Sequence, residues 1–220
     1  DPATMTVDPN SRLVLVGATP SSGFPILFGT HGVGGLVFGD DGSLLATAGD
    51  GASTAADYGG AMTASYSVQA LADGIISTKE DVGVYRPQLL SSLSGKMIRI
   101  NPATGEGYPT NPFYNPLEPK SAESRTWALG LRNPFSITKK PNSGSHNPAD
   151  GEPGVFIVGD VGLNRWEEMN VITGPGQNFG WPMYEGMNYT YDFNQGFATA
   201  DIENRDEPVS GACSQSYYYF

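Results

Sequence analysis

His31 and Asp50 are the residues of this 220-residue chain whose types and spacing could do chemistry. They lie near the two ends of residues 30–51, THGVGGLVFGDDGSLLATAGDG, a segment typical of two apolar strands folded about a turn. The turn is Asp40-Asp41-Gly42, whose residue types tolerate the positive φ angles that a tight hairpin needs. His31 comes ten residues before Asp41, and Asp50 comes nine residues after it. If the strands pair antiparallel about this turn, His31 and Asp50 therefore meet at the open end of the hairpin.

Such a pair would form a general base. A carboxylate that accepts a hydrogen bond from one imidazole nitrogen fixes the tautomer of the histidine, so that the other nitrogen can take a proton. The alternative is a loop histidine and a turn aspartate that do not touch. Spacing alone leaves both interpretations open.

Short strands joined by turns are the elements that must position this pair. The chain contains 29 glycines and 17 prolines and shows no long apolar period of 3.6 residues, which favours an all-β fold over helical layers. Residues 52–92 lack strand alternation and predict a long loop with one helical turn around Val68 to Ala72. Further strands are predicted at Leu13 to Val16, at Ile26 to Phe28, at Met97 to Ile100, up to Leu129, and at Phe135 to Thr138, with two more between residues 154 and 182.

A second segment, GVFIVGDVG from Gly154 onwards, repeats the pattern of LLATAGDGA in the hairpin. Each is an apolar strand closed by Gly-Asp and a further glycine, at Gly49-Asp50 and at Gly159-Asp160. The offset is 110 residues, which is about two units of the roughly 40 to 55 residues typical of a propeller blade. The offset favours a repeated blade without establishing it.

The charge of the chain bounds its partners. The net charge of -11, from 12 basic and 23 acidic residues, argues against nucleic acid, because few cations are present to neutralise phosphates. The acidity fits either calcium and an extracellular setting or solubility alone. Cys213 is the single cysteine, so no disulfide forms within the chain, and no apolar run of about twenty residues predicts a membrane span. The chain starts at Asp1 without a Met and ends on three tyrosines and Phe220, and we expect it to be part of a longer protein.

Four motifs, in this order and spacing, carry a resemblance to a known family. They are the hairpin sequence above, LSGKMIRINPATGEGYPTNPF, WALGLRNPFSI and GDVGLNRWEEMNVITGPGQNFGWPMYEG. Over roughly residues 12 to 190 the chain resembles the glucose/sorbosone dehydrogenases, the soluble quinoprotein sugar dehydrogenases. The resemblance implies a six-bladed β-propeller of which residues 1–220 are a partial domain of about three to four blades. It implies a loop insertion at 52–92, an irregular start of the next blade at 183–220, and remaining blades supplied by the rest of the protein.

The resemblance also implies cofactors and roles. The cofactors are pyrroloquinoline quinone (PQQ) and calcium, and the reaction is oxidation of an aldose to its lactone with hydride transfer to the quinone. His31 would be the base that takes the proton from the anomeric hydroxyl, and Asp50 would orient it. Arg132 would face the quinone and stabilise its negative charge, as suits a permanently charged planar donor.

Other residues are implied around the cofactor. Asn133 and Val161 would contact the quinone, and backbone carbonyls of the turn at Gly162 and Leu163 would hold calcium. The partners implied are a small sugar and a separate electron acceptor, in a protein that is secreted, periplasmic or at the cell surface.

The same positions leave an alternative open. Val161 and Leu163 stand where well-studied members have a glutamine and a proline, so this chain could be a non-catalytic propeller that binds carbohydrate or protein in a large extracellular multidomain protein. Trp166 and Trp181 are interpreted as packing residues, and Glu167-Glu168 as a pair that anchors a loop.

Overall fold

Antiparallel β-sheet makes up most of the regular structure in the part of the chain that the structure describes. The computed structural model describes residues 4, 6–52 and 66–190. The strands are β1 (Val33–Phe38), β2 (Leu44–Ala48), β3 (Lys96–Ile100), β4 (Thr126–Leu129), β5 (Pro134–Lys139), β6 (Phe156–Asp160), β7 (Glu168–Ile172), β8 (Tyr184–Glu185) and β9 (Asn188–Tyr189). The helices are α1 (Ser67–Ala72), α2 (Ala122–Arg125) and the 3-10 turns η1 (Pro9–Ser11), η2 (Pro20–Ser22), η3 (Thr78–Glu80), η4 (Gly83–Gln88) and η5 (Pro148–Asp150).

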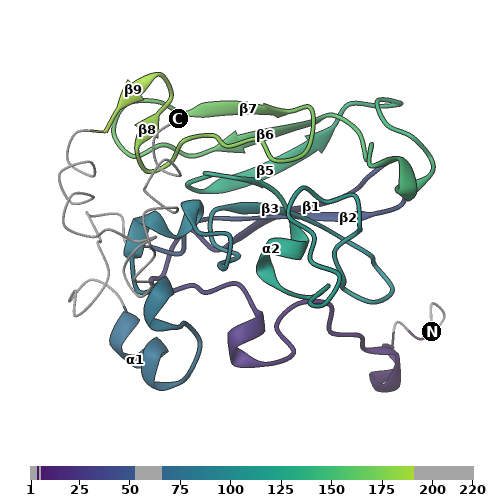
Figure 1. The fold of residues 1–220 in the computed structure, drawn as a ribbon, viewed down its shortest axis with the longest axis horizontal. Helices are drawn as coiled ribbons and strands as arrows, with labels where there is room; N and C mark the ends of the chain where they lie inside the picture. Colours follow the sequence, from purple (N-terminus) through teal and green to yellow (C-terminus); the bar gives the residue numbers. More distant parts are fainter. Residues whose placement is uncertain (1–3, 5, 53–65, 191–220) are drawn as a thin grey trace.

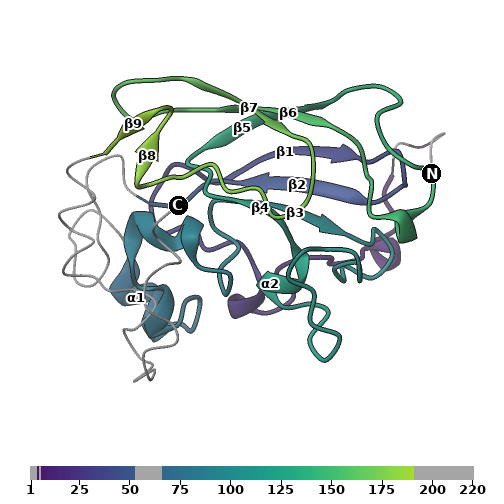
Figure 2. The same cartoon turned by 45° about the horizontal axis from the view of Figure 1, so that its top comes forward.

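Two sheets are stacked on each other. One has the strand order β1-β2-β3-β4, the other has the order β5-β6-β7, and β8 and β9 form a separate hairpin. Figures 1 and 2 show β5 to β7 lying over β1 to β3, with α1 and α2 on the opposite side of the lower sheet. The prediction of an all-β fold is confirmed, and the stacked antiparallel sheets have the arrangement of neighbouring propeller blades.

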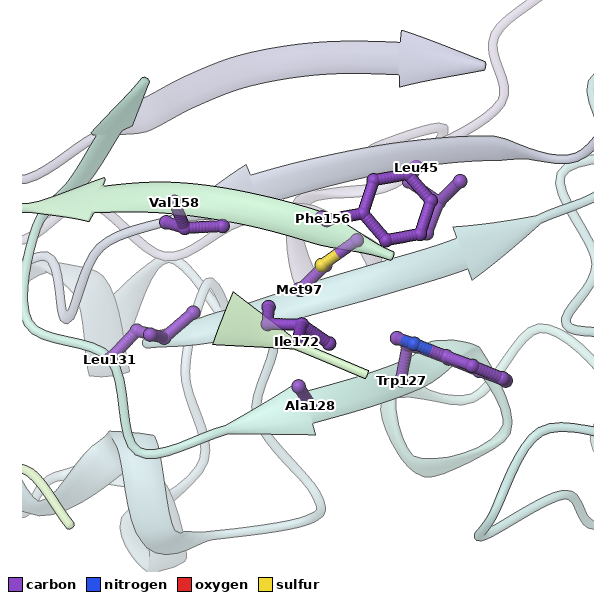
Figure 3. Packing of buried hydrophobic residues seen from close by; sticks show 8 residues of the cluster. All are labelled: Leu45, Met97, Trp127, Ala128, Leu131, Phe156, Val158 and Ile172. Carbon is purple, nitrogen blue, oxygen red and sulfur yellow. The ribbon is translucent and has the colours of Figure 1, made fainter. Parts of the chain in front are cut away.

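An apolar layer holds the two sheets together. Leu45 of β2 and Met97 of β3 are buried in one cluster with Phe156 and Val158 of β6 and Ile172 of β7, as Figure 3 shows. Phe156 and Val158 occupy alternate positions of β6, because successive side chains of a strand point to opposite faces of its sheet. Fully burying each such side chain stabilises the fold by about 1.5–3 kcal/mol.

The hairpin of β1 and β2 has the predicted register. Leu36 pairs with Ala46, and Phe38 pairs with Leu44, on either side of the Asp40-Asp41-Gly42 turn. The register shifts between Val33 and Leu36, so the open end of the hairpin carries a bulge. The hairpin prediction is confirmed.

Two predicted strands are wrong. Residues Leu13 to Val16 and Ile26 to Phe28 are in no strand. Leu15 and Val16 instead pack against the buried cluster on the outer face of β2 and β3, so their apolar character reflects contact with the face of a sheet and not pairing at its edge.

The predicted loop at residues 52–92 contains α1, η3 and η4, and α1 coincides with the predicted helical turn. Residues 53–65 of this loop lie outside the described residues. So do Cys213 and residues 191–220 of the predicted start of the next blade. β8 and β9 lie within residues 183–190, and the division of the chain into blades stays a prediction. Within the described ranges, no helix has the length and apolar character needed to cross a membrane.

Candidate active site

The structure brings His31 and Asp50 together at the open end of the hairpin. His31 lies two residues before β1, and Asp50 lies two residues after β2. The His31 Nδ1 and the Asp50 Oδ1 are 2.8 Å apart. The His31 side chain is 5% exposed and that of Asp50 is fully buried, so water does not compete for this hydrogen bond. The interpretation in which the two residues do not touch is excluded.

Backbone geometry at the hairpin end makes this contact possible. His31 has a φ of 56°, in the left-handed region that non-glycine residues rarely adopt. Gly49 allows two chain segments to approach each other, since a Cβ there would lie 2.6 Å from the His31 carbonyl oxygen and 2.9 Å from that of Arg132. The Asp50 N–H donates to the same Arg132 carbonyl at 2.8 Å. The turn after β4 is thereby joined to the hairpin.

Asp50 has further donors that fix the orientation of its carboxylate. Its Oδ1 also accepts a hydrogen bond from the Ala52 N–H at 2.9 Å, and its Oδ2 accepts one from the Trp181 indole N–H at 2.8 Å. An ionised carboxylate only accepts hydrogen bonds. The proton of the His31–Asp50 bond is therefore assigned to His31 Nδ1, which leaves Nε2 as the nitrogen that can accept a proton.

Arg132 lies beside this pair. Its Nη1 donates to the carbonyl oxygens of Val161 and Gly162, each at 2.8 Å, and its guanidinium carbon lies 5.2 Å from the centre of the Trp181 ring. Its Nε is buried and has no hydrogen-bond partner among the described residues. Burial lowers the pKa of Arg132, and the nearby carboxylates, of which Asp50 contributes most, oppose this effect. The arrangement places a cationic group with an unused donor near the His31–Asp50 pair.

Asp160 holds the backbone at Arg132 in place. Its Oδ2 accepts a hydrogen bond from the Arg132 N–H at 3.0 Å, and its Oδ1 accepts one from the Asn133 N–H at 2.6 Å. The Asn133 carbonyl in turn accepts from the Val161 N–H at 3.1 Å. Burial raises the pKa of Asp160 to about 7, although the two N–H groups oppose the shift. Sequence reasoning did not assign this residue a role, and the signal was present in the Gly-Asp pattern shared by residues 49–50 and 159–160.

Glu185 organises the predicted calcium turn. Its Oε1 accepts hydrogen bonds from four successive backbone N–H groups at 2.6 to 3.3 Å, those of Leu163, Asn164, Arg165 and Trp166. Burial alone would raise the pKa of Glu185, but these N–H groups outweigh it, so the pKa is lowered. Glu167 accepts a hydrogen bond from the Gly162 N–H at 3.3 Å, in the manner of a loop anchor. The Leu163 side chain packs against the buried cluster that includes Trp181.

Residues of η4 and of the start of β3 hold the backbone near Asp50 in place. Arg86 donates to the Asp50 carbonyl through Nε at 3.3 Å and through Nη2 at 3.2 Å. Lys96 is completely buried, and its Nζ donates to the carbonyls of Arg86, Pro87 and Ser94 at 2.7 to 3.1 Å. Burial holds the pKa of Lys96 well below its usual value. No sequence pattern pointed to these residues, because they act on backbone carbonyls that only the folded chain brings near.

Comparisons with known proteins agree with the motifs. The family model of glucose/sorbosone dehydrogenase matches residues 25–212. The HIPL1 protein of Arabidopsis thaliana is 30% identical over 171 residues, which are 72% of this chain and 19% of that protein. The HIPL2 protein of the same plant is 30% identical over 166 residues, which are 71% of this chain and 19% of that protein. The chain thus spans about a fifth of the length of these relatives.

Solved structures are similar at lower identity. The PQQ-bound form of an aldose sugar dehydrogenase from Streptomyces coelicolor is 24% identical with a TM-score of 0.49, over 77% of this chain and 35% of that chain. A glucose dehydrogenase is 23% identical with a TM-score of 0.44, over 70% of this chain and 32% of that chain. The family match over residues 25–212 confirms the resemblance seen in the sequence. The chain belongs to the glucose/sorbosone dehydrogenase family.

Proposed function

We propose that this chain is the part of a PQQ-dependent sugar dehydrogenase that carries the catalytic base. The reaction would be oxidation of an aldose to its lactone. The observation that supports this proposal is the buried contact between His31 and Asp50 beside Arg132. A buried and oriented imidazole–carboxylate pair is an arrangement suited to removing a proton from a substrate hydroxyl.

Each of the three residues has a distinct task in this proposal. His31 Nε2 accepts the proton of the sugar's anomeric hydroxyl, because Nδ1 is held by Asp50. Asp50 stabilises the imidazolium that results, at a distance of 2.8 Å. Arg132 supplies positive charge where negative charge develops during the reaction.

The residues around Arg132 fit an anionic, oxygen-rich cofactor. The Nε of Arg132 is a buried donor without a partner among the described residues, and an unsatisfied buried donor is costly unless a ligand pairs with it. When bound, PQQ supplies the oxidant that accepts hydride from the sugar. Val161 accepts a hydrogen bond from Arg132 through its carbonyl, and its N–H donates to the Asn133 carbonyl. The cofactor roles of Asn133 and Val161 stay predictions. A separate electron acceptor would complete the turnover.

The calcium role of the backbone carbonyls at the Gly162–Leu163 turn stays a prediction. The Gly162 carbonyl already accepts a hydrogen bond from Arg132. No group of three or more His, Cys, Asp or Glu side chains in the described ranges is placed to hold a metal. No step proposed here uses calcium.

A second candidate function is a non-catalytic propeller that binds carbohydrate or protein in an extracellular multidomain protein. Val161 and Leu163 favour it, because apolar side chains replace residues that serve the cofactor in well-studied members of the family. Both candidates need further blades from the rest of the protein. The exposed apolar side chains of Leu36 and Phe38 on β1 and of Met169 and Val171 on β7 support such covering blades.

Titration of the full-length protein with PQQ, followed by absorbance, and dye-linked oxidation of a panel of aldoses test the enzymatic proposal. We expect saturable PQQ binding and turnover, with His31→Asn losing activity by about 10²- to 10⁴-fold while PQQ still binds. His146→Asn is the matched control, since His146 is exposed and contacts Asp40 in the hairpin turn, at the opposite end of the hairpin from His31, and it should keep full activity. Absence of PQQ binding and of turnover would favour the non-catalytic propeller.

A further inference from the structure

Trp181 links the residues of the candidate active site across the chain. It follows β7 in the connection to β8 and is 4% exposed, within a buried cluster that includes Ala52, Val82, Tyr85 and Leu89. Its sequence context predicted a packing residue. The packing is present, but two contacts of its indole go beyond packing.

The first contact is polar and the second is electrostatic. The indole N–H of Trp181 donates to the Asp50 Oδ2 at 2.8 Å, 131 residues away along the chain. The face of the same ring lies 5.2 Å from the guanidinium carbon of Arg132, within the range of a cation–π interaction. One side chain therefore contacts both the carboxylate of the proposed base and the proposed anion-binding cation.

The backbone of Trp181 is itself held on both sides. Its N–H donates to the Gly130 carbonyl at 3.0 Å, and its carbonyl accepts a hydrogen bond from Gln88 Nε2 at 2.6 Å. Gly130 belongs to the turn that carries Arg132, and Gln88 ends η4, which carries Arg86. These two hydrogen bonds fix the backbone position from which the indole reaches Asp50 and Arg132.

The two oxygens of Asp50 have different partners, and this gives the indole N–H a specific task. Oδ1 serves His31 and Ala52, whereas Oδ2 accepts from Trp181. Without the indole N–H, Oδ2 would lose a donor in a fully buried position, and the carboxylate would rotate about its Cβ–Cγ bond towards other donors. That rotation would lengthen the hydrogen bond from His31 Nδ1 to Asp50, so the proton of the imidazole would no longer be held on Nδ1.

We propose that Trp181 is a positioning residue, which sets the carboxylate plane of Asp50 through its indole N–H and the place of Arg132 through its ring face. Its effect on turnover rests on the proposed function. Its effect on the geometry of the His31–Asp50 hydrogen bond is separate and holds whether or not the protein oxidises a sugar.

Two substitutions in the full-length protein separate the two contacts. Trp181→Phe keeps an aromatic face under Arg132 and removes the N–H, so we expect loss or broadening of the downfield proton resonance of the His31 Nδ1–H. We also expect a fall in kcat of about tenfold, the loss of one charge-assisted hydrogen bond, with little change in KM. Trp181→Leu removes both contacts, so it should in addition weaken PQQ binding several-fold.

Trp127→Phe is the matched control. Trp127 is equally buried, and its indole N–H has no partner among the described residues, so its removal should leave the His31 resonance and kcat unchanged. Equal effects of Trp181→Phe and Trp127→Phe, or an unchanged His31 resonance in Trp181→Phe, would overturn the proposal. If wild type neither binds PQQ nor turns over while the resonance still responds to Trp181→Phe, the proposed function fails and the positioning role stands.

A measurement on stably folded protein covers the case in which Trp181→Phe does not fold. In the wild type, the Trp181 indole N–H should exchange slowly with deuterium and resonate downfield of the other indole protons. In Asp50→Asn the indole N–H faces either a neutral amide oxygen or an NH₂ group in place of the charged carboxylate, so its resonance should move upfield in both cases. An unshifted resonance would overturn the proposal.

Discussion

Substitution of Asp50 by asparagine tests the site most directly, because the carboxylate accepts from three donors at once. These are the His31 Nδ1–H, the Ala52 N–H and the Trp181 indole N–H. Asparagine keeps one acceptor oxygen and replaces the other with an NH₂ group that can only donate. Its oxygen could serve His31 and Ala52, but its NH₂ group would then face the indole N–H of Trp181. In the reversed orientation the NH₂ group faces His31.

Both orientations have measurable consequences. At least one buried donor loses its partner, so we expect Asp50→Asn to lower the free energy of unfolding by about 1–3 kcal/mol in urea titrations. If the NH₂ group faces His31, the imidazole must accept at Nδ1 and carry its proton on Nε2. Nε2 then cannot take a proton from the substrate. We expect kcat to fall by about 10²- to 10⁴-fold in dye-linked oxidation, with the Nε2-protonated tautomer visible in ¹⁵N spectra of His31.

The control for this substitution is Asp41→Asn at the other end of the hairpin. Asp41 is also buried, and its Oδ2 pairs with Arg99 Nη2 at 2.6 Å, so its loss should reduce stability without changing the tautomer of His31. If Asp50→Asn kept kcat within about tenfold of the wild type and also left the free energy of unfolding unchanged, the reasoning about the His31–Asp50 pair would be refuted.

Three further predictions concern the surroundings of the pair. Gly49→Ala places a Cβ 2.6 and 2.9 Å from two backbone carbonyl oxygens, so we expect the free energy of unfolding in urea to fall by about 1–3 kcal/mol. Gly174→Ala is the control and should be nearly neutral, because a Cβ there meets nothing within 4 Å. Burial raises the pKa of Asp160 to about 7 from 3.8, so the folded state binds this proton more tightly than the unfolded chain does. The stability gained from protonation is therefore present at acid pH and is lost as the pH rises through about 7. This loss is at most about 4 kcal/mol, at about 1.36 kcal/mol per pH unit, and unfolding measured from pH 4 to pH 8 should show it in the wild type and not in Asp160→Asn. Lys96→Met removes one donor from each of three buried carbonyls, of which those of Arg86 and Pro87 keep a backbone N–H donor, and it should cost at least about 2 kcal/mol. A stability equal to wild type would contradict the role assigned to the buried Lys96 side chain.

Local sequence determined the strands that carry the site. The hairpin from residue 30 to residue 51 followed from alternating apolar residues about Asp40-Asp41-Gly42, and the register placed His31 opposite Asp50. This prediction succeeded because hairpin pairing is set by residues close together in the chain. The same reasoning was wrong for Leu13 to Val16, since an apolar run does not reveal whether it pairs at a sheet edge or, as Leu15 and Val16 do, packs on a sheet face.

By itself, the sequence determined the family, the all-β class and the spacing of the proposed base and its carboxylate. Only the tertiary structure decided what surrounds them. Trp181, Arg86 and Asp160 reach the site from distant segments, and Lys96 supports it by donating to backbone carbonyls. Such contacts depend on how sheets and loops pack, and a donor to a carbonyl leaves no pattern in the sequence because every residue presents that carbonyl.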